Sequence, residues 1–349
     1  MKRRQCGKSG LELPLLGIGC WAFGGGDYWG RQDQSDVDDL VHMSIERGCN
    51  FFDTAEVYND GDSELSLGKA LTDVPRDRVL ICTKIAPANT ATGVLKDHLE
   101  ASLKRLGTDY VDIYMVHYPI TPQSLKHTSS DAKILENPPS EEEAFEALTE
   151  LKGQGKIRYI GISNYGVKQL SRVLETGVDI VVNQMAYNLF CRAIEMGVLP
   201  LCRKRGIGII GFMPLLQGIL AGKYHGPDEV PAARARTRHF AGSRHQSRHG
   251  EAGMEDLIFE TLDWIRSLSR EIGVSMADMA IAWCAANTDI TCVLTGVRNV
   301  NQLEANIRSI SIELSADVIR KLNERTAPIL DKLGDSPDYW ENRNNSRII

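Results

Sequence analysis

The sequence predicts a closed (β/α)8 (TIM) barrel in a single domain. Short apolar runs with strand character alternate eight times with amphipathic helical stretches. Strands that alternate with helices indicate a parallel sheet. Eight such units, with no change of composition between the two halves of the chain, favour a closed barrel over an open sheet. Polar or ionisable side chains end several of the apolar runs, and the carboxyl ends of parallel strands are where α/β proteins build sites.

The elements follow in a regular order. Strands are expected near 15–20, 50–53, 78–84, 110–117, 157–163, 179–185, 207–212 and 290–296, and helices near 34–47, 62–71, 93–106, 140–153, 167–176, 197–205, 255–272 and 299–308. Segment 2–14 reads as an N-terminal β-hairpin that covers the bottom of the barrel, with its turn at 7–10. The barrel core should span about 15–310 of the single domain 1–349. Residues 311–349 should add a C-terminal helix near 315–330 and an irregular tail.

A dinucleotide-binding Rossmann fold is the main alternative. The segment Gly17-Ile-Gly-Cys-Trp-Ala22 matches the relaxed glycine fingerprint of that fold. The fingerprint must open a helix, whereas this segment continues into the glycine-rich loop Phe23–Trp29. The context therefore favours the barrel.

Composition excludes several classes of protein. The net charge of −6 gives no reason to expect a nucleic-acid or membrane partner, and no apolar run approaches the length of a membrane span. The basic start Met1–Arg4 is not followed by the apolar stretch of a signal peptide. The eight cysteines form no C-x-x-C pair. We read them as free thiols in the cytoplasm and expect no metal site.

The strand ends carry a set of side chains that could share one mouth. In order they are Trp21, Asp53, Lys84, His117, Ser163-Asn164, Asn183-Gln184, Phe212 and Gly296. Each has an ordinary structural explanation alone: an aspartate can cap a helix, and a lone histidine is more often a core residue than a catalyst. A common position at the mouth explains them together.

Asp53, Tyr58, Lys84 and His117 suit proton transfer to a carbonyl oxygen. A tyrosine has a pKa of about 10. An ammonium about 4 Å away favours the phenolate by roughly 4 kcal/mol at an effective dielectric near 20, so Lys84 should lower the pKa of Tyr58. Asp53 would hold Lys84, and His117 would position the carbonyl. Tyr58 is then a general acid, and a hydride source completes a reduction.

These segments resemble the aldo-keto reductase family, which also contains potassium-channel β subunits. The resemblance runs from about residue 3 to 330 and rests on Gly17–Gly24, Phe51–Tyr58, Ser102–Asp112, Gly155–Asn164 and Pro214–Tyr224. It implies a catalytic tetrad of Asp53, Tyr58, Lys84 and His117, with Tyr58 as acid in reduction and base in oxidation.

The resemblance also implies a nicotinamide cofactor. The residues that match its binding positions are Trp21, Asp53, Ser163, Asn164, Gln184, Phe212, Pro214, Leu215, Gly218, Lys223, Gly296, Arg298, Gln302 and Asn306. Phe212 would stack on the nicotinamide. Met213 and Ala305 depart from the family pattern at a pyrophosphate and an adenine contact. Arg298 suits a 2′-phosphate, which predicts NADP(H) as the preferred cofactor, with NAD(H) as the alternative.

The loop 225–250 holds five arginines. It reads equally as a solvated or partly disordered surface loop and as a basic lid over cofactor phosphates, with Arg234, Arg236 and Arg238 as candidate ligands.

The expected substrate pocket comprises Trp21, Tyr58, His117 and Tyr118. Tyr28, Trp29, segment 119–139 and the tail near Tyr339 and Trp340 are within reach. We expect an NADPH-dependent reductase of a small aldehyde or ketone, including sugar-derived carbonyls. The alternatives are a cofactor-sensing regulatory subunit and a sugar or polyol dehydrogenase. The histidine at 117 favours an enzyme, because channel subunits of this family tend to lack it.

Overall fold

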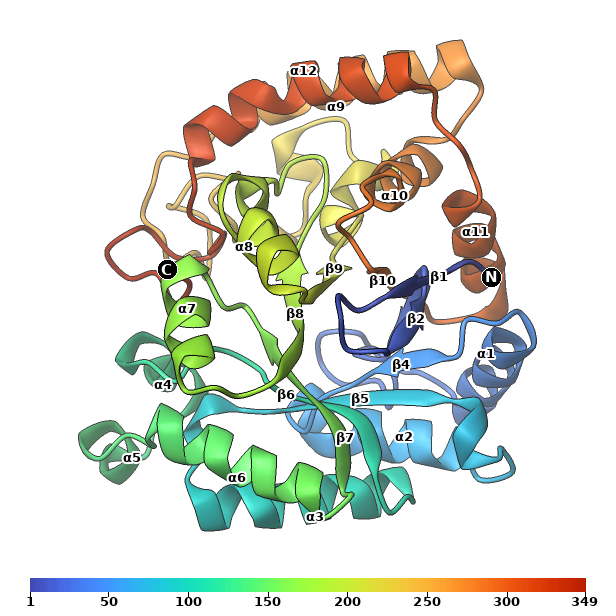
Figure 1. Cartoon of the computed structure of the whole chain (residues 1–349). Coiled ribbons are helices and arrows are strands. Elements are labelled where there is room, and N and C mark those ends of the chain that lie inside the picture. The colour runs from blue at the N-terminus through green and yellow to red at the C-terminus, as the bar shows by residue number, and fades with distance from the viewer.

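The computed structural model describes residues 1–349 and contains a closed barrel of eight parallel strands (Figure 1). The strands are β3 (Leu16–Gly19), β4 (Phe51–Asp53), β5 (Leu80–Ile85), β6 (Val111–Val116), β7 (Ile157–Ser163), β8 (Ile180–Ala186), β9 (Gly208–Phe212) and β10 (Cys292–Gly296). They follow one another around the barrel, and β10 closes it by pairing with β3. Each overlaps one of the expected runs. The predicted (β/α)8 barrel is confirmed.

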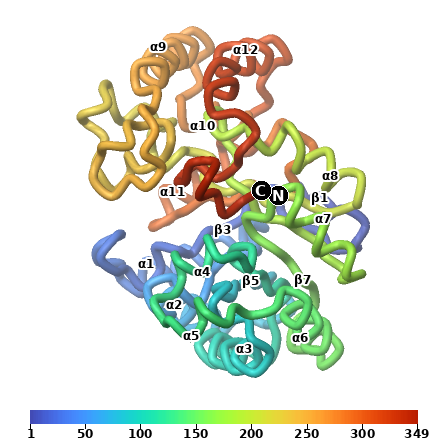
Figure 2. The backbone as a smooth tube through the Cα atoms, turned by 90° about the vertical axis from the view of Figure 1, so that its left-hand side faces the viewer, coloured from blue at the N-terminus to red at the C-terminus, as the bar shows by residue number.

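Helices surround the strands (Figures 1 and 2). They are α1 (Gln34–Glu46), α2 (Asp62–Ala70), α3 (Thr92–Leu106), α4 (Pro122–Thr128), α5 (Ala132–Glu136), α6 (Glu141–Gly153), α7 (Val167–Glu175), α8 (Val198–Arg205), α9 (Glu255–Ile272), α10 (Met276–Ala286), α11 (Val300–Ile310) and α12 (Ala316–Leu333). Every expected helix is present, including the extra C-terminal one. α4, α5 and α10 were not expected.

The helix that lies against the barrel between β9 and β10 is α10, which corrects the sequence interpretation. The expected helix near 255–272 exists as α9, but it lies beside α12 at the edge of the molecule (Figure 1). α10 contacts β10 and α11 instead. Residues 279–285 of α10 are all buried, so the helix has no polar face. A helix buried on all sides lacks the apolar–polar periodicity from which helices are recognised.

Several helices begin where side chains cap them. The side-chain oxygens of Ser140, Ser275, Asn299 and Ser315 each accept a hydrogen bond from the backbone N–H three residues later, at the start of α6, α10, α11 and α12. Such caps satisfy N–H groups that have no partner within the helix. Of the capped helices, α6 packs on β7 and α11 on β3, as in other barrels, whereas α12 packs against α9.

An N-terminal hairpin closes the bottom of the barrel, as predicted. β1 (Arg3–Gln5) pairs antiparallel with β2 (Glu12–Pro14). Cys6, Leu11 and Leu13 are buried and join a cluster of side chains from the barrel interior, including Phe51, Cys82, Ile113, Met115, Val182, Ile210 and Cys292. Gly7 has a positive φ and lies so close to the carbonyl of Gly206 that a Cβ would overlap it. The hairpin therefore fills the bottom of the barrel and leaves the opposite end of the barrel open for a site.

Barrel packing explains the glycines that resemble a Rossmann fingerprint. A Cβ on Gly17 would lie 2.8 Å from both the Cys292 sulfur and the Phe51 ring. After β3 the chain enters a loop, and the next helix begins at Gln34. Gly17 therefore permits close packing inside the barrel, and the fingerprint does not open a helix here.

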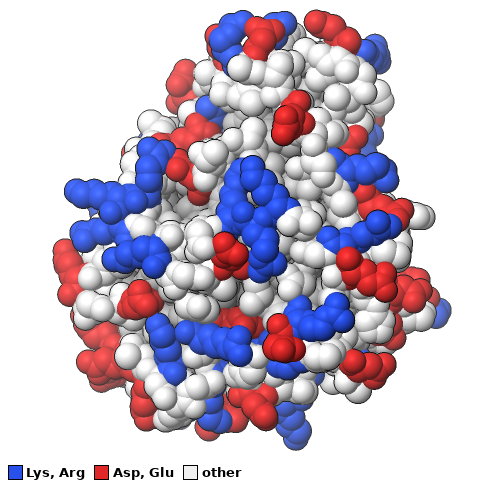
Figure 3. All heavy atoms as spheres, turned by 45° about the vertical axis from the view of Figure 1, so that its right-hand side comes forward, with Lys and Arg blue, Asp and Glu red and all other residues white.

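The distribution of surface charges and the free state of the cysteines are consistent with what the composition predicts. Acidic and basic side chains are interspersed on the face shown in Figure 3. All eight cysteines are free and buried, and burial raises the pKa of Cys49 to about 11. None of the helices combines the length and the apolar character that crossing a bilayer requires.

Candidate active site

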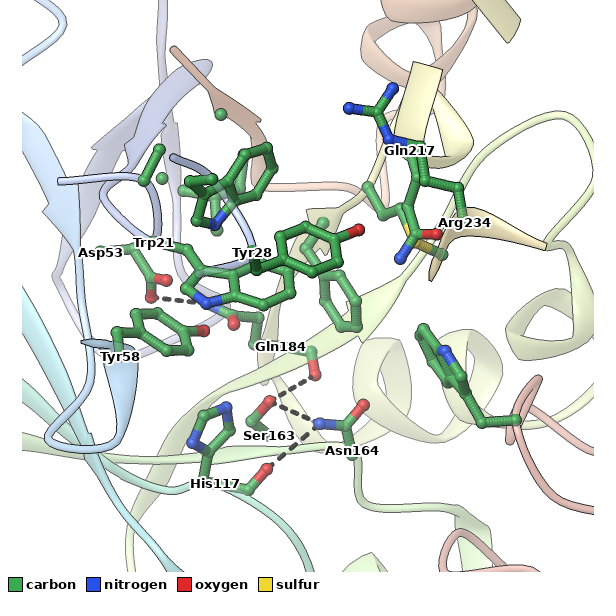
Figure 4. Close-up of a pocket in the computed structure, with 18 of the residues that line it drawn as sticks. Trp21, Tyr28, Asp53, Tyr58, His117, Ser163, Asn164, Gln184, Gln217 and Arg234 are labelled. Carbon is green, nitrogen blue, oxygen red and sulfur yellow. Dashed lines mark hydrogen bonds between the residues drawn. The ribbon is translucent and has the colours of Figure 1, made fainter. Parts of the chain in front are cut away.

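A cavity of about 670 Å³ opens at the carboxyl ends of the strands. Its lining includes most of the residues that the sequence singled out, namely Trp21, Asp53, Tyr58, His117, Tyr118, Ser163, Asn164, Gln184, Phe212, Lys223, Gly296, Arg298 and Gln302. The structure thus brings together the predicted catalytic residues, the predicted substrate pocket and most of the expected cofactor positions. Figure 4 shows how the labelled residues converge.

Five expected site residues do not line this cavity. Lys84 lies behind it, fully buried in β5. Pro214 and Leu215 belong to the turn before the 3-10 helix Leu216–Ala221, which contains Gly218. Asn306 is buried in α11. For the last four, the structure shows no side chain in the cavity.

Asp53 and Lys84 form a buried ion pair inside the mouth. The Lys84 ammonium donates to Asp53 Oδ1 at 2.6 Å and to the carbonyl of Thr54 at 2.8 Å. The amide of Gln184 donates to the second carboxylate oxygen, Oδ2, at 2.7 Å. Burial disfavours the ammonium, but the charge of Asp53 overcomes this and raises the pKa of Lys84 above its ordinary value. Lys84 is therefore a permanent positive charge beneath the cavity.

The chain after β4 carries Tyr58 over this pair. The backbone of Glu56 donates to the carbonyl of Lys84, which continues the β4–β5 pairing beyond the strand. Tyr58 then begins the 3-10 helix Tyr58–Gly61. Its hydroxyl accepts a hydrogen bond from the Lys84 ammonium at 3.3 Å. The predicted contact between the phenol and the ammonium is present.

The net effect on the pKa of Tyr58 differs from the expectation. Burial raises the pKa of the phenol, Lys84 lowers it and Asp53 raises it, and the balance lies at about 12. Desolvation of the buried phenol, which the expectation left out, outweighs the nearby ammonium. At neutral pH Tyr58 therefore carries its proton, which is the form that a general acid needs.

His117 faces Tyr58 from the end of β6. The two rings lie 5.5 Å apart, edge to face, and the Tyr118 ring stacks on His117 at 5.6 Å. Burial, with the charges of Lys84 and Arg347, holds the pKa of His117 well below its usual value. A neutral imidazole can donate one hydrogen bond and accept another. Tyr58 and His117 can thus both donate to one oxygen placed between them.

Amides occupy the ends of β7 and β8. Asn164 adopts a left-handed backbone conformation, with φ of 63°. Its side-chain nitrogen donates to the His117 carbonyl at 3.1 Å and to the Ser163 hydroxyl at 3.0 Å. The Asn164 amide oxygen accepts no hydrogen bond from the protein and can accept one from a ligand amide. Phe212, at the end of β9, lines the same region.

Aromatic rings form the wall beside Tyr58. Trp21 stacks on Tyr28 at 5.0 Å and meets Trp29 edge to face at 5.2 Å. Asn59, which follows Tyr58, donates its amide to the carbonyls of Trp21 and Phe23, both at 2.9 Å. This tie fixes the aromatic loop to the turn that carries the phenol, so a planar or apolar substrate would contact Trp21 as it reaches Tyr58.

Cations gather at the other end of the cavity. Lys223, Arg234 and Arg236 line it, and none of the three forms an ion pair with a carboxylate. Arg234 donates to the Tyr224 hydroxyl, and the buried Nε of Arg236 has no hydrogen-bond partner. An unpaired guanidinium nitrogen fits a phosphate ligand. Arg238 points elsewhere: it is buried and pairs with Glu251 at 2.8 Å.

Arg298 and Gln302, which the sequence predicts to contact the adenosine of a cofactor, also line the cavity. Gln302 accepts from the backbone N–H of Arg298 at 3.0 Å. The Arg298 guanidinium donates to Gln32 Oε1 at 2.9 Å and to the carbonyl of Arg31 at 2.5 Å. These two bonds leave Nη1 free, and they connect Arg298 to the loop that carries the aromatic wall.

Part of the cover over the cavity was not expected from the sequence. Gln217, Gln246, Arg248 and Arg347 line the cavity, together with Trp340 from the tail. The loop 225–250 packs tightly against the tail, with Thr237, His239, Phe240 and His249 buried. This part of the loop is therefore a packed cover, whereas other residues of the loop, such as His225, Asp228 and His245, are exposed. Among these residues the arginine content of 225–250 gave a signal, whereas Arg347 belonged to no recognisable motif.

Comparisons with known proteins agree with this geometry. A family model for the aldo/keto reductase family matches residues 15–326. Escherichia coli NADH-specific methylglyoxal reductase is 30% identical, with 93% of this chain and 99% of that protein aligned. A probable voltage-gated potassium channel subunit beta from Arabidopsis thaliana is 29% identical, with 95% of each chain aligned. Escherichia coli L-glyceraldehyde 3-phosphate reductase is 30% identical, with 89% of this chain and 88% of that protein aligned.

Solved structures give the same result. The thermostable aldo-keto reductase Tm1743, solved with the inhibitor epalrestat, superposes with a TM-score of 0.71 at 26% identity, covering 93% of this chain and 100% of that chain. The holo form of aldo-keto reductase AKR11C1 from Bacillus halodurans gives 0.69 at 25% identity, covering 92% and 96%. Since the family model and the relatives cover nearly the whole barrel, this protein belongs to the aldo/keto reductase family.

Proposed function

We propose that the protein is an NADPH-dependent reductase of small aldehydes or ketones, with Tyr58 as the general acid. The arrangement around the phenol carries the proposal. The Tyr58 hydroxyl lies 3.3 Å from the Lys84 ammonium, and the neutral His117 ring lies 5.5 Å from the Tyr58 ring. A carbonyl oxygen between Tyr58 and His117 would meet two hydrogen-bond donors at the place where negative charge develops.

Each residue has a separate part in this reaction. A nicotinamide dinucleotide bound along the cavity would supply the hydride. As the carbonyl carbon gains that hydride, its oxygen takes the proton of Tyr58, and the phenolate that remains is stabilised by Lys84. Asp53 keeps Lys84 charged and in place through the 2.6 Å ion pair. His117 donates to the same oxygen and orients the carbonyl.

The residues of the cavity fit such a cofactor. Asn164 offers a free amide oxygen to a carboxamide, Phe212 offers a ring for stacking, and Lys223, Arg234 and Arg236 offer cations to the phosphates. We assign NADP(H) as the preferred cofactor because Arg298 keeps Nη1 free at the adenosine end. Asp33 and Asp36 line a neighbouring hollow with Arg298 and oppose a further negative charge. Measured KM values for NADPH and NADH decide the preference, and a lower KM for NADH would reverse it.

Replacing Tyr58 by phenylalanine tests the mechanism. We expect Tyr58→Phe to lower the rate of NADPH oxidation with 4-nitrobenzaldehyde by about 10²–10⁴-fold, which is the usual contribution of a general acid. Cofactor binding, measured by quenching of tryptophan fluorescence, should change less than about twofold, because none of the proposed cofactor contacts involves the Tyr58 hydroxyl. Loss of cofactor binding in Tyr58→Phe would contradict the assignment of Tyr58 as a purely catalytic residue.

A cofactor-binding regulatory subunit is the second candidate, since relatives include proteins named as potassium channel β subunits. The complete set of Asp53, Tyr58, Lys84 and His117 favours the enzyme. A panel of aldehydes, ketones, sugars and inositols, assayed in both directions with both cofactors, distinguishes a reductase from a dehydrogenase. A wild-type protein that binds NADPH but turns over no member of the panel faster than Tyr58→Phe would be a binding protein.

A further inference from the structure

We propose that Arg347, from the C-terminal tail, binds an anionic group of the carbonyl substrate, so that the enzyme prefers aldehydes or ketones that bear a carboxylate or phosphate. This inference rests on the proposed reductase function and adds the substrate class to it. Arg347 is the third residue from the end of the chain, in a tail without helix or strand.

The end of the tail is fixed in place at the start of α7. The terminal carbonyl of Ile349 accepts the backbone N–H of Lys168 at 3.0 Å. Gln169 donates its side-chain amide to the carbonyl of Arg347 at 2.8 Å and accepts the N–H of Ile349 at 2.9 Å. Gly166 leaves room for this contact, since a Cβ there would overlap Ile349. Figure 1 shows the C-terminus beside α7. The backbone of Arg347 is therefore held on both sides.

The Arg347 side chain is fixed as well. Its Nε and Nη2 donate to the two carboxylate oxygens of Asp338 at 2.9 and 2.7 Å. Asp338 is fully buried and Arg347 is 5% exposed. The third guanidinium nitrogen, Nη1, forms no hydrogen bond within the protein. Arg347 lines the cavity and Asp338 does not, so Nη1 is the nitrogen left to face a ligand. A guanidinium held in this way needs little reorganisation on binding.

Arg347 reaches the reacting end of the cavity. Its guanidinium carbon lies 4.6 Å from the centre of the Tyr118 ring, and that ring stacks on His117 at 5.6 Å. Figure 4 places His117 and Tyr58 at one end of the pocket and Arg234 with Gln217 at the other. The charge of Arg347 also contributes to the lowered pKa of His117. Arg347 is therefore a neighbour of the carbonyl position, away from the group that suits the phosphates.

The lining of the cavity is predominantly cationic. It contains six cationic side chains, Lys223, Arg234, Arg236, Arg248, Arg298 and Arg347, and one carboxylate, Asp53, although Arg248 and Arg347 each pair with a carboxylate outside the lining, Glu341 and Asp338. Lys84 already pairs with Asp53. Lys223, Arg234 and Arg298 suffice for the phosphates of a dinucleotide. A neutral substrate would need the aromatic wall and the two donors at its oxygen, but no cation beside Tyr118.

Matched pairs of substrates test the proposal in the full chain with NADPH. The pairs are 4-carboxybenzaldehyde with 4-nitrobenzaldehyde, and glyceraldehyde 3-phosphate with glyceraldehyde. In Arg347→Met we expect kcat/KM to fall about 10- to 100-fold for the anionic member of at least one pair, which is the loss typical of a charge-assisted hydrogen bond. For the neutral members we expect kcat/KM to fall less than about threefold. A loss in the benzaldehyde pair would show that Arg347 binds a carboxylate, and a loss in the glyceraldehyde pair would show that it binds a phosphate. Arg343→Met is the control, since Arg343 is an exposed tail arginine paired with Asp335.

A second variant separates recognition from folding. Arg347→Met leaves Asp338 buried without its partner, whereas the double variant Asp338→Asn/Arg347→Met removes both charges. If the double variant melts like the wild type and keeps the selective loss, the proposal stands. Equal losses for charged and neutral substrates, or no loss, would overturn it.

Binding of unreactive analogues provides a readout without turnover. In the presence of NADP⁺, the wild type should bind benzoate or inorganic phosphate more tightly than benzamide, and Arg347→Met should lose this preference. A preference that persists in Arg347→Met would overturn the proposal. Absence of turnover by the wild type with every carbonyl would instead reject the reductase function, and the analogues would still decide the role of Arg347.

Discussion

The two ends of the cavity are built differently. At the reacting end, Asp53, Lys84 and His117 extend from β4, β5 and the end of β6, and their positions follow from strand register. At the other end, where we propose that the cofactor phosphates bind and which we call the phosphate end, Lys223, Arg234 and Arg236 belong to the long connection between β9 and α9. In the first group, Asp53 and Lys84 are buried and bonded to each other and His117 is half-buried, whereas the second group is partly exposed and has no carboxylate partner.

The residues at the reacting end are therefore held in place before a ligand binds, whereas the cations at the phosphate end gain a partner only when a ligand binds. A buried charge is tolerated only when it is paired, so Asp53 and Lys84 depend on each other for stability as well as for function. Partly exposed cations keep much of their hydration and need no partner until a phosphate arrives. Changes at the reacting end should therefore affect folding and chemistry together. Changes at the phosphate end should affect cofactor affinity alone.

The largest effect is expected for Lys84→Met. Loss of the ammonium leaves Asp53 as a buried, unpaired carboxylate, which should lower the free energy of unfolding by about 3–5 kcal/mol. It also removes the charge that stabilises the Tyr58 phenolate, so kcat should fall by at least about 10³-fold, since one nearby ammonium is worth roughly 4 kcal/mol. Denaturant unfolding and NADPH oxidation measure the two effects.

A double variant separates the effect of Lys84 on stability from its effect on activity. Asp53→Asn/Lys84→Met removes both buried charges and should regain most of the lost stability while remaining inactive. If the double variant recovers activity along with stability, Lys84 has only a structural role and the two ends of the cavity are less different than we argue.

The sequence could predict the reacting end because strands obey simple rules. Apolar runs mark the strands, and a polar residue at the end of each run must face the common mouth, so the runs alone place Asp53, Lys84 and His117 together. The pKa of Tyr58 could not be predicted, because it depends on how completely the phenol is desolvated. Only the packed structure shows that burial outweighs the nearby ammonium.

Substitutions at the phosphate end should change the affinity for NADPH. For Lys223→Met and Arg234→Met we expect the KM for NADPH to rise about 10-fold each, in line with the loss of one charge-assisted hydrogen bond. Because these side chains are partly exposed, the melting temperature should change by less than about 2 °C, as for most surface substitutions. A large loss of kcat at saturating NADPH in either variant would show that the phosphate end also controls the chemistry.

Arg298 should give a smaller and more selective effect. In Arg298→Met we expect kcat/KM to fall about 5- to 20-fold with NADPH and less than about twofold with NADH, because a single guanidinium contact to a 2′-phosphate is lost. The ratio of the two kcat/KM values is the measurement. An equal fall for both cofactors would mean that Arg298 acts through its bonds to Arg31 and Gln32, by holding the aromatic loop.

The covering segments were the hardest part to predict. Segment 225–250 and the tail contain no periodic apolar pattern, and their order comes from long-range contacts such as Arg238 with Glu251 and Arg248 with Glu341. Arg347 reaches the cavity because α7 binds the chain terminus, a contact that no local rule encodes. The apolar helix α10 was missed for a related reason, since its neighbours rather than its own pattern define it.

The smallest effect concerns His117 and pH. Because its pKa is lowered in the folded protein, the unfolded chain binds a proton near pH 6.5 that the folded chain does not. Stability should therefore be lost as the pH falls below about 6.5, by roughly 1 kcal/mol in the first pH unit. His117→Asn should lose less stability than the wild type between pH 7 and 5. Urea unfolding at several pH values measures this. An equally steep loss in His117→Asn would mean that His117 is protonated in the folded protein, and its role as a neutral donor beside Tyr58 would be wrong.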